Sequence, residues 1–575
     1  MSNTLHLEFD QFIKNNHPNL IFRPQQKEVI LDMIDAYFEN PNGIYLLDAP
    51  TGSGKSLIAM MFSDFLVHKK NKGYILASDL VLHQQYVNDF RRMKLWNWGD
   101  VKGIDNYLCI VNNEPFSIGD CKNKGISYKE AEQLSCFKQC KYLMSRRKAI
   151  RSPISLLTYP YALIQRNFVE NKQDIPPFPK RDFVVCDEAH KLLDIVQSHF
   201  SPIVSHDIYK KIDKLLDTLF EIGVSVPKIS SVRLEKAIHK IDKENNNKIL
   251  LEQLKIVTKE LSKLISIVGD LREQASDYFI DEKVPKDWII AFNLYDWCKD
   301  VHCKLEDYCE IIDKVGIQKM VKNPNDKNII FNCIDEYYLL DKHFYNKFGF
   351  KLLMTATMGK PADFMKNHGI SKAKYFKMSS HFNWEKSPII YYPGRRLSER
   401  FIDDNFDWSI EKLLDILSMH TGESGIIHTA SYDRAKKIHQ ALPKMIKSKV
   451  LLYKGSEEKT KVLKKMKKKP GLIIMGPSLL EGLNLIDDLS RFQIFMKVPY
   501  PHLGDKYVAA KLQHSQDWYN WKTSVNVLQG VGRSIRSETD WAITYLLDGG
   551  FGDLFRNAGS QFPIEFRNRI QIERK

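Results

Sequence analysis

Residues 48–56 read Asp-Ala-Pro-Thr-Gly-Ser-Gly-Lys-Ser, and they decide the fold of this chain. The apolar residues 43–47 before them predict a buried strand, and residues 57–62 after them have helical spacing without a breaker. A strand, a turn of small residues, Gly-Lys-Ser and a helix make up the phosphate-binding loop arrangement. Small residues let backbone N–H groups surround phosphate oxygens, and the helix N-terminus adds partial positive charge. We therefore expect a nucleotide site here, although Ala49 stands where the pattern has glycine.

The polar residues in and near this loop have distinct expected roles. Lys55 is expected to reach the β- and γ-phosphates of ATP, and the Ser56 hydroxyl to bind Mg²⁺. Upstream, Arg23 and Gln26 can hydrogen-bond an adenine edge, although a solvated helix start has similar residues. The residues expected to bind ATP are Arg23, Gln26, Thr51, Gly52, Ser53, Gly54, Lys55 and Ser56.

An acidic pair supplies the expected second half of the site. The apolar residues 183–186 predict a buried strand, and Asp187-Glu188-Ala189-His190 follow it directly. An acidic pair at this place downstream of a phosphate loop is typical of nucleotide hydrolysis. We expect Asp187 to complete the Mg²⁺ shell and Glu188 to orient and deprotonate the attacking water.

Composition limits the class of protein. At 575 residues, the chain is long enough for three or four domains of about 150 residues. No apolar run approaches the roughly 20 residues of a membrane span, and the N-terminus lacks signal-peptide features, so we expect an intracellular, cytoplasmic protein. A net charge of +15 favours a polyanionic partner, with nucleic acid first. Nine irregularly spaced cysteines argue against a disulfide framework.

The order of apolar strands and helices predicts two α/β units with parallel sheets. Before the last strand of the first unit, residues 195–335 have helical character, including a seam of apolar residues from Leu250 to Leu271 at coiled-coil spacing. The lysine-rich residues 461–469 are expected to form a solvated helix face, with a phosphate contact as the alternative. Strands are expected at 43–47, 74–78, 154–158, 183–186, 350–354, 425–428, 450–453, 471–475, 492–497 and 542–547.

Residues 99–150 interrupt the first unit and hold four of the nine cysteines, Cys109, Cys121, Cys136 and Cys140. A group of thiols in an intracellular protein favours a metal site over disulfides. Structural zinc generally uses two short cysteine pairs, and only Cys136 and Cys140 form one. Iron–sulfur ligation tolerates wider gaps. Spacing alone leaves an iron–sulfur cluster, zinc and unrelated thiols open.

Together these motifs resemble those of the XPD/DinG-like, Rad3-related family of superfamily-two DNA helicases. Residues 529–536, Gln-Gly-Val-Gly-Arg-Ser-Ile-Arg, are similar to motif VI and are the most specific signal. Motif V differs from the family pattern at one position, because Asn484 stands where the family usually has aspartate. The other matching stretches are Arg23 with Gln26 (Q motif), 48–56 (motif I), 187–190 (DEAH box), 355–357 (motif III), 428–432 (motif IV) and 481–484 (motif V).

The resemblance implies an α/β fold with two RecA-like parallel-sheet lobes that clamp ATP and Mg²⁺. It implies that Arg533 and Arg536 are transition-state cations and that Gln529 places the water. It also implies a [4Fe–4S] cluster held by Cys109, Cys121, Cys136 and Cys140. The implied domains are lobe 1 at residues 1–100, 151–195 and 336–360, an iron–sulfur domain at 101–150, a helical arch domain at 196–335, and lobe 2 at 361–575.

The implied activity is ATP-dependent translocation on single-stranded DNA, 5′→3′, with unwinding of duplex. Single-stranded and forked DNA are the expected partners of a monomer without membrane attachment. Two alternatives stay open: an ATP-dependent nucleic-acid binding or remodelling factor that separates no strands, and an RNA helicase.

Overall fold

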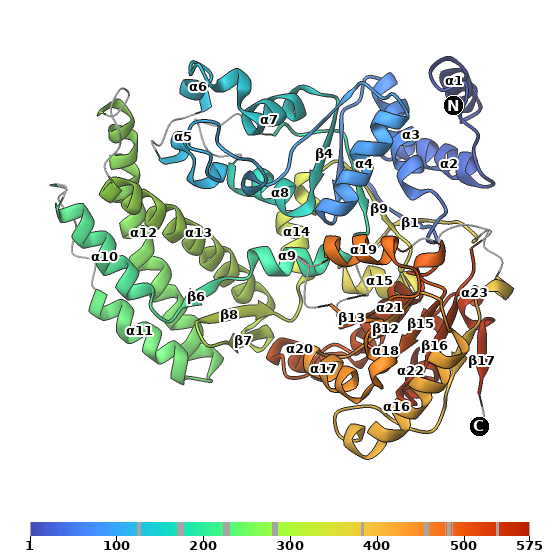
Figure 1. Cartoon of the computed structure of the whole chain (residues 1–575). Coiled ribbons are helices and arrows are strands. Elements are labelled where there is room, and N and C mark those ends of the chain that lie inside the picture. The colour runs from blue at the N-terminus through green and yellow to red at the C-terminus, as the bar shows by residue number, and fades with distance from the viewer. Residues whose placement is uncertain are drawn as a thin grey trace.

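Two parallel sheets form the centres of two lobes, which confirms the predicted fold class. The computed structural model describes residues 2–123, 128–169, 178–221, 223, 231–278, 286–380, 384–453, 459–477, 479, 485, 487–535 and 540–573. In Figure 1, lobe 1 lies above lobe 2 on the right, and a bundle of long helices extends to the left. Among the described residues, no helix is both long enough and apolar enough to cross a membrane.

Lobe 1 contains a seven-stranded sheet of order β10-β1-β9-β5-β2-β4-β3, paired in parallel throughout. Most of its strands are short apolar runs that are buried on both faces, as a sheet covered by helices requires. Its strands are β1 (Ile44–Asp48), β2 (Gly73–Ala77), β3 (Trp98–Asp100), β4 (Ile154–Thr158), β5 (Phe183–Asp187), β9 (Phe350–Thr355) and β10 (Lys374–Lys377). Its helices include α1 (Ser2–Asn16), α2 (Gln26–Glu39), α3 (Lys55–His68), α4 (Leu80–Arg92), α8 (Tyr159–Ile164), α9 (Leu192–Phe200), α14 (Tyr337–His343) and α15 (Pro361–Asn367).

The first sheet extends beyond the boundary expected at residue 361. β10 pairs with β1, with Tyr375 opposite Leu46, so residues 374–377 belong to the sheet of lobe 1. The sequence did not indicate this strand, because it is short and has a lysine at each end. In the structure, only Phe376 of the strand is buried. The chain enters the second sheet only at β11 (Ile389–Tyr391).

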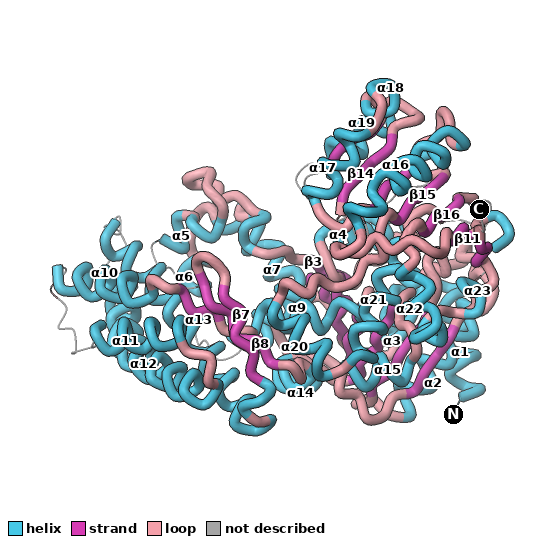
Figure 2. Tube along the Cα trace, turned by 90° about the horizontal axis from the view of Figure 1, so that it is seen from below, coloured by secondary structure: helices cyan, strands magenta, loops and turns pink. Residues whose placement is uncertain are grey.

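Lobe 2 contains the second parallel sheet, of order β13-β14-β12-β15-β16-β11-β17. The two edges of this sheet are β13 and β17, and Figure 2 shows the lobe at the upper right. The remaining strands are β12 (Gly425–His428), β13 (Val450–Leu452), β14 (Ile473–Gly476), β15 (Phe492–Phe495), β16 (Ile543–Leu546) and β17 (Ile570–Ile572). The helices are α16 (Ile402–Met419), α17 (Tyr432–Ala441), α18 (Lys444–Lys447), α19 (Lys459–Lys468), α20 (Lys506–His514), α21 (Gln516–Val531), α22 (Gly550–Ala558) and α23 (Ile564–Arg567).

The segment inserted into lobe 1 between α9 and α14 forms the helix bundle of Figure 1, with α10 (Ile208–Glu221), α11 (Ser231–Lys243), α12 (Asn247–Tyr278) and α13 (Lys286–Val315). The apolar seam is its packing face, because Leu250, Leu254, Val257, Leu261, Leu264 and Val268 of α12 are all buried. The side chain of Leu271 lies outside the described residues. A small antiparallel sheet, of order β6-β8-β7, was not predicted; its strands are β6 (Ile203–Ser205), β7 (Met320–Pro324) and β8 (Asn328–Cys333).

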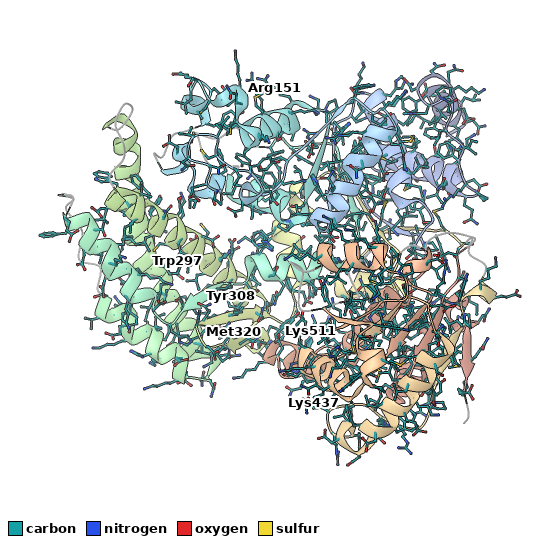
Figure 3. The ribbon with its side chains drawn as sticks, in the orientation of Figure 1. Arg151, Trp297, Tyr308, Met320, Lys437 and Lys511 are labelled. Carbon is teal, nitrogen blue, oxygen red and sulfur yellow. The ribbon has the colours of Figure 1, made fainter. Side chains whose placement is uncertain are left out.

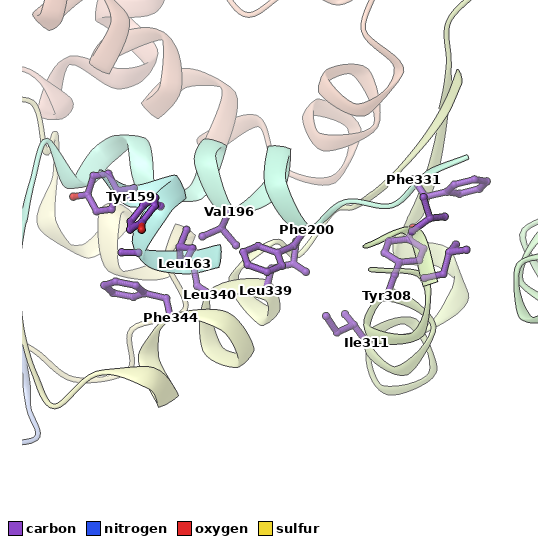
Figure 4. Packing of buried hydrophobic residues seen from close by; sticks show 14 of the residues in the cluster. Tyr159, Leu163, Val196, Phe200, Tyr308, Ile311, Phe331, Leu339, Leu340 and Phe344 are labelled. Atoms are coloured by element: carbon purple, nitrogen blue, oxygen red, sulfur yellow. The ribbon is translucent and has the colours of Figure 1, made fainter. Parts of the chain in front are cut away.

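One apolar core runs from lobe 1 into this bundle. Tyr159 of α8, Phe200 of α9 and Leu340 of α14 belong to the same buried cluster as Tyr308 of α13 and Phe331 of β8 (Figure 4). The bundle is therefore packed onto lobe 1 and is not joined to it by a flexible tether alone.

Two segments that join the helix bundle to lobe 1, the small antiparallel sheet and the residues before α14, also contact lobe 2. Lys511 of α20, labelled in Figure 3, forms an ion pair with Glu336, which precedes α14. The two residues are 6% and 3% exposed, so the pair is buried. Asn323 of β7 donates to Asp505 Oδ1 at 2.9 Å, and Asp505 caps the N-terminus of α20. These contacts connect α20 to two parts of the chain that precede lobe 2 in sequence.

Candidate active site

The phosphate-binding loop lies between β1 and α3, where the sequence predicted it. β1 ends at Asp48 and α3 begins at Lys55. Gly52 and Gly54 have φ values of 80° and 84°, a region that glycine adopts without strain. A Cβ atom at Gly54 would lie 2.4 Å from Gln26 Nε2, so a larger residue there would displace the Gln26 side chain. Lys55 Nζ donates to the Ala49 carbonyl oxygen at 3.3 Å.

Arg23 and Gln26 hold this loop in place. Gln26 is 2% exposed; its Nε2 donates to the Ser53 carbonyl oxygen at 2.7 Å, and its Oε1 accepts from the Arg23 backbone N–H at 2.9 Å. Arg23 Nη1 donates to the Gly52 carbonyl oxygen at 2.7 Å. The structure thus places both residues beside the loop, as the sequence predicted. It directs their polar groups to the loop backbone, whereas the sequence argument directed them to an adenine edge.

The acidic pair stands at the end of β5. Asp187 is 2% exposed and accepts from the Tyr86 hydroxyl at 2.9 Å through Oδ2, and from the Glu188 backbone N–H at 2.9 Å through Oδ1. Burial and then the Glu188 carboxylate raise the pKa of Asp187 to about 6, against the opposing charge of Lys55. Glu188 itself has a left-handed φ of 56°, which turns the chain sharply at the end of the strand.

His190 connects this acidic pair to motif III and to lobe 2. Its Nδ1 lies 2.8 Å from Thr355 Oγ1, 3.2 Å from Thr357 Oγ1 and 3.4 Å from Glu188 Oε2. Its Nε2 contacts the side-chain amide of Gln529 in α21. Three stretches that are far apart in sequence therefore meet at one buried imidazole.

Lobe 2 closes over the phosphate-binding loop. A Cβ atom at Gly532 would lie 3.3 Å from Thr51 Oγ1, so motif VI already touches the loop. Burial lowers the pKa of His428, at the end of β12, to about 4. A hydrogen bond from His428 Nε2 to Gln493 Oε1 at 3.3 Å opposes this decrease, and the positive charge of nearby Arg533 adds to it. Arg536 and residues 481–484 lie outside the described residues.

A pocket opens between the lobes beside the loop. It encloses about 760 Å³ of empty space, including the part that opens to solvent. Its walls come from the phosphate loop, from β10 and the residues after it, and from α21 and the α23 region; they include Asp48, Pro50, Thr51, Thr357, Lys377, Met378, Leu528, Gly532, Glu565 and Phe566.

The four cysteines of residues 99–150 lie in one neighbourhood among α5 (Asp120–Asn123), α6 (Tyr128–Ala131) and α7 (Lys141–Arg151). Burial raises the pKa of Cys121 to about 12, and the thiols of Cys136, Cys109 and Cys140 add to the increase. The four sulfurs are therefore close enough to interact, and four thiols suit an iron–sulfur cluster in donor type. Among the described residues, no group of three or more cysteine, histidine, aspartate or glutamate side chains is arranged so that it would hold a metal ion.

Tyr86 is a residue of the site that the sequence argument missed. It is fully buried in α4, and its hydroxyl lies within hydrogen-bonding reach of both Asp187 and Ser56, the two expected Mg²⁺ ligands. No local signal in the sequence distinguishes Tyr86 from a core residue, because a tyrosine on the apolar face of an amphipathic helix is normally part of the hydrophobic core.

Comparisons with known proteins agree with this geometry. Residues 413–569 match the family model of a helicase C-terminal domain, and residues 19–226 match that of the res subunit of type III restriction enzymes. The chain is 24% identical over 253 residues to the ATP-dependent DNA helicase DinG of Photobacterium profundum, covering 40% of this chain and 36% of that protein. It is 21% identical over 224 residues to a probable ATP-dependent helicase of Methanocaldococcus jannaschii, covering 35% of this chain and 33% of that protein.

The chain thus matches about a third of the length of each of these curated relatives. Among solved structures, it resembles Xpd4 of S. tokodaii, with a TM-score of 0.59 and 15% identity over 96% of this chain and 100% of that one. It also resembles a structure titled XPD helicase, with a TM-score of 0.61 and 16% identity over 96% and 100% of the two chains. At these identities, the structural matches show that the fold is shared.

Proposed function

Because the chain belongs to the XPD/DinG-like, Rad3-related helicases of superfamily two, we propose that it hydrolyses ATP to translocate on single-stranded DNA, 5′→3′, and to unwind duplex. The similarity to the DNA helicase DinG of Photobacterium profundum supports DNA over RNA as the substrate. The net charge of +15 supports a polyanionic partner.

The contact between His190 and Gln529 carries this proposal. Hydrolysis in a two-lobed motor needs groups from both lobes at one nucleotide, because the lobes must sense which nucleotide is bound. Here the DEAH box of lobe 1 and motif VI of lobe 2 touch through buried side chains. Any nucleotide-dependent movement of α21 would therefore act directly on the residue that lies beside Glu188.

In the proposed reaction, Lys55 holds the β- and γ-phosphates. Ser56 and Asp187 would hold Mg²⁺, which neutralises phosphate charge when bound. Tyr86 keeps these two ligands side by side through its hydroxyl. Glu188 orients the attacking water and takes its proton. Gln529 and Arg533 belong to lobe 2. Arg533 and Arg536 would balance the charge that develops on the transferred phosphoryl group, and Gln529 would place the water.

We further propose the domain division implied by the resemblance, with lobe 1 extended through β10. Cys109, Cys121, Cys136 and Cys140 would hold a [4Fe–4S] cluster, whose binding would supply folding energy to residues 101–150. The mutual effect of the four thiols on the pKa of Cys121 supports this donor set. The bundle α10–α13 would form the arch at the rim where strands separate.

The test compares Lys55→Ala with Lys372→Ala, a control at an exposed lysine away from the nucleotide site. Lys55→Ala is expected to abolish DNA-stimulated ATP hydrolysis and fork unwinding while single-strand binding survives. Wild-type hydrolysis by Lys55→Ala would refute the nucleotide site. In the wild-type chain, stimulated hydrolysis without release of a strand from a forked duplex would instead support the remodelling alternative. Stimulation and unwinding by RNA alone would support the RNA helicase.

A further inference from the structure

The positive charge of the chain is concentrated in one short segment. Residues 432–469 contain thirteen lysines and one arginine against one aspartate and two glutamates, a net charge of +11. The whole chain carries +15, so the other 537 residues together carry only +4. The electrostatic attraction to a polyanion that the composition predicts therefore comes mainly from this segment of lobe 2.

The structure places these lysines around the edge of the second sheet that is formed by β13. α17 and then α18 precede β13 in sequence, and α19 follows it. Figure 2 shows α17, α18 and α19 at the top of that view. Lys437, labelled in Figure 3, lies at the lower edge of the lobe in that view. Ten of the lysines are exposed: Lys436, Lys437, Lys444, Lys449, Lys461, Lys464, Lys465, Lys467, Lys468 and Lys469. Among the described residues, no carboxylate forms an ion pair with any of these ten.

α19 presents its lysines from a firmly anchored helix. Val462 and Met466 are 7% and 0% exposed and pack into an apolar cluster of lobe 2. The helix contains no acidic residue, so its lysines at spacings of three and four face one another as like charges. A helix dipole favours lysines in the last turn, but it does not account for Lys461 and Lys464 at the other end. An external anion would relieve the repulsion along the whole helix.

Four of these lysines lie at the edge of the sheet opposite the interlobe site. In a parallel sheet, the carboxyl ends of all strands share one edge, and His428 and the motif VI contacts belong to that edge. Lys449 directly precedes β13, and its carbonyl oxygen accepts from the Ile473 N–H of β14 at 3.0 Å. Lys467, Lys468 and Lys469 lie at and just after the C-terminal end of α19, three residues before β14 begins. These four lysines therefore gather at the amino ends of the strands, on the opposite edge of the sheet.

We propose that these ten exposed lysines form a second docking surface for the phosphate backbone of nucleic acid, outside the interlobe cleft. The inference rests on the proposed function for its choice of polyanion. Protein interfaces are depleted of lysine and have an apolar centre, whereas the apolar side chains of α19 face inward. Lysines that are exposed and unpaired suit sequence-independent phosphate contacts. The surface would hold a segment of the substrate that is not passing between the lobes.

The test neutralises five lysines at once, with Lys464, Lys465, Lys467, Lys468 and Lys469 each changed to Gln. The matched control changes the same five residues to Arg, which keeps the charge. Affinity for a long mixed-sequence single strand is measured over a range of salt concentrations without nucleotide. If three to five of the lysines contact phosphates, the log–log slope should become less steep by about 2 to 3.5 in the Gln variant and stay unchanged in the Arg variant.

A second variant tests the lysines that precede β13 in sequence, with Lys436, Lys437 and Lys444 each changed to Gln. It provides the test if the five-lysine Gln variant does not fold. A wild-type slope in a folded Gln variant would overturn the proposal. So would a Gln variant that loses affinity for polyglutamate but not for DNA, since the partner would then be an acidic protein. The measurement needs no ATP, so it is independent of the Lys55→Ala result, and failure of the one does not imply failure of the other.

Discussion

Changing Gln26 to Ala tests whether this residue supports the phosphate loop or reads the base. The structure gives its side-chain amide two hydrogen bonds, one to the Ser53 carbonyl oxygen at 2.7 Å and one from the Arg23 backbone N–H at 2.9 Å. A net hydrogen bond contributes about 0.5–1.5 kcal/mol, so the pair contributes about 1–3 kcal/mol to the ordered loop. At about 1.4 kcal/mol for each factor of ten, the KM for a nucleoside triphosphate should rise about 5- to 150-fold.

The assay compares ATP, GTP and inorganic tripolyphosphate as ligands of the wild type and Gln26→Ala. A residue that orders the loop affects all three equally, because all three bind through phosphates. Gln25→Ala is the matched control, because its side-chain oxygen accepts from the Ser379 N–H at 2.8 Å and not from a residue of the loop. The reasoning is refuted if Gln26→Ala weakens ATP alone and leaves GTP and tripolyphosphate unchanged, because Gln26 would then contact adenine.

Three further predictions follow from particular contacts. Glu336→Ala leaves the Lys511 ammonium buried without its carboxylate and should destabilise the chain by about 3–5 kcal/mol in urea unfolding, whereas an unchanged midpoint would mean that the pair is not buried in solution. Gln529→Ala removes the contact with His190 and should lower DNA-stimulated ATP hydrolysis by about tenfold, the equivalent of one hydrogen bond, while equal loss of nucleotide affinity would indicate a binding role instead. Cys140→Ser should remove visible absorbance and fork unwinding and retain ATP hydrolysis; a coloured, fully active variant would contradict the cluster.

The sequence alone determined the parts of this protein that depend on local spacing. Five-residue apolar runs separated by amphipathic helices predict parallel strands, because a strand buried on both faces must be apolar throughout. The phosphate loop between β1 and α3 and the buried seam of α12 follow from the same kind of evidence. In each case, the residues that make the structure are close together in the chain.

The tertiary structure alone decided what distant residues do to one another. Tyr86 and Asp187 are 101 positions apart, and neither residue type reveals that their side chains meet. β10 joins the sheet of lobe 1 as its edge strand, beside β1. This pairing depends on β1 being next to the edge of the assembled sheet, which the residues of β10 alone do not reveal. Gln26 turns inward because the carbonyl oxygen of Ser53 is within its reach, a fact of packing that no spacing rule contains. Periodicity records only which face of an element is buried, whereas the choice of partner depends on the three-dimensional arrangement of all the elements.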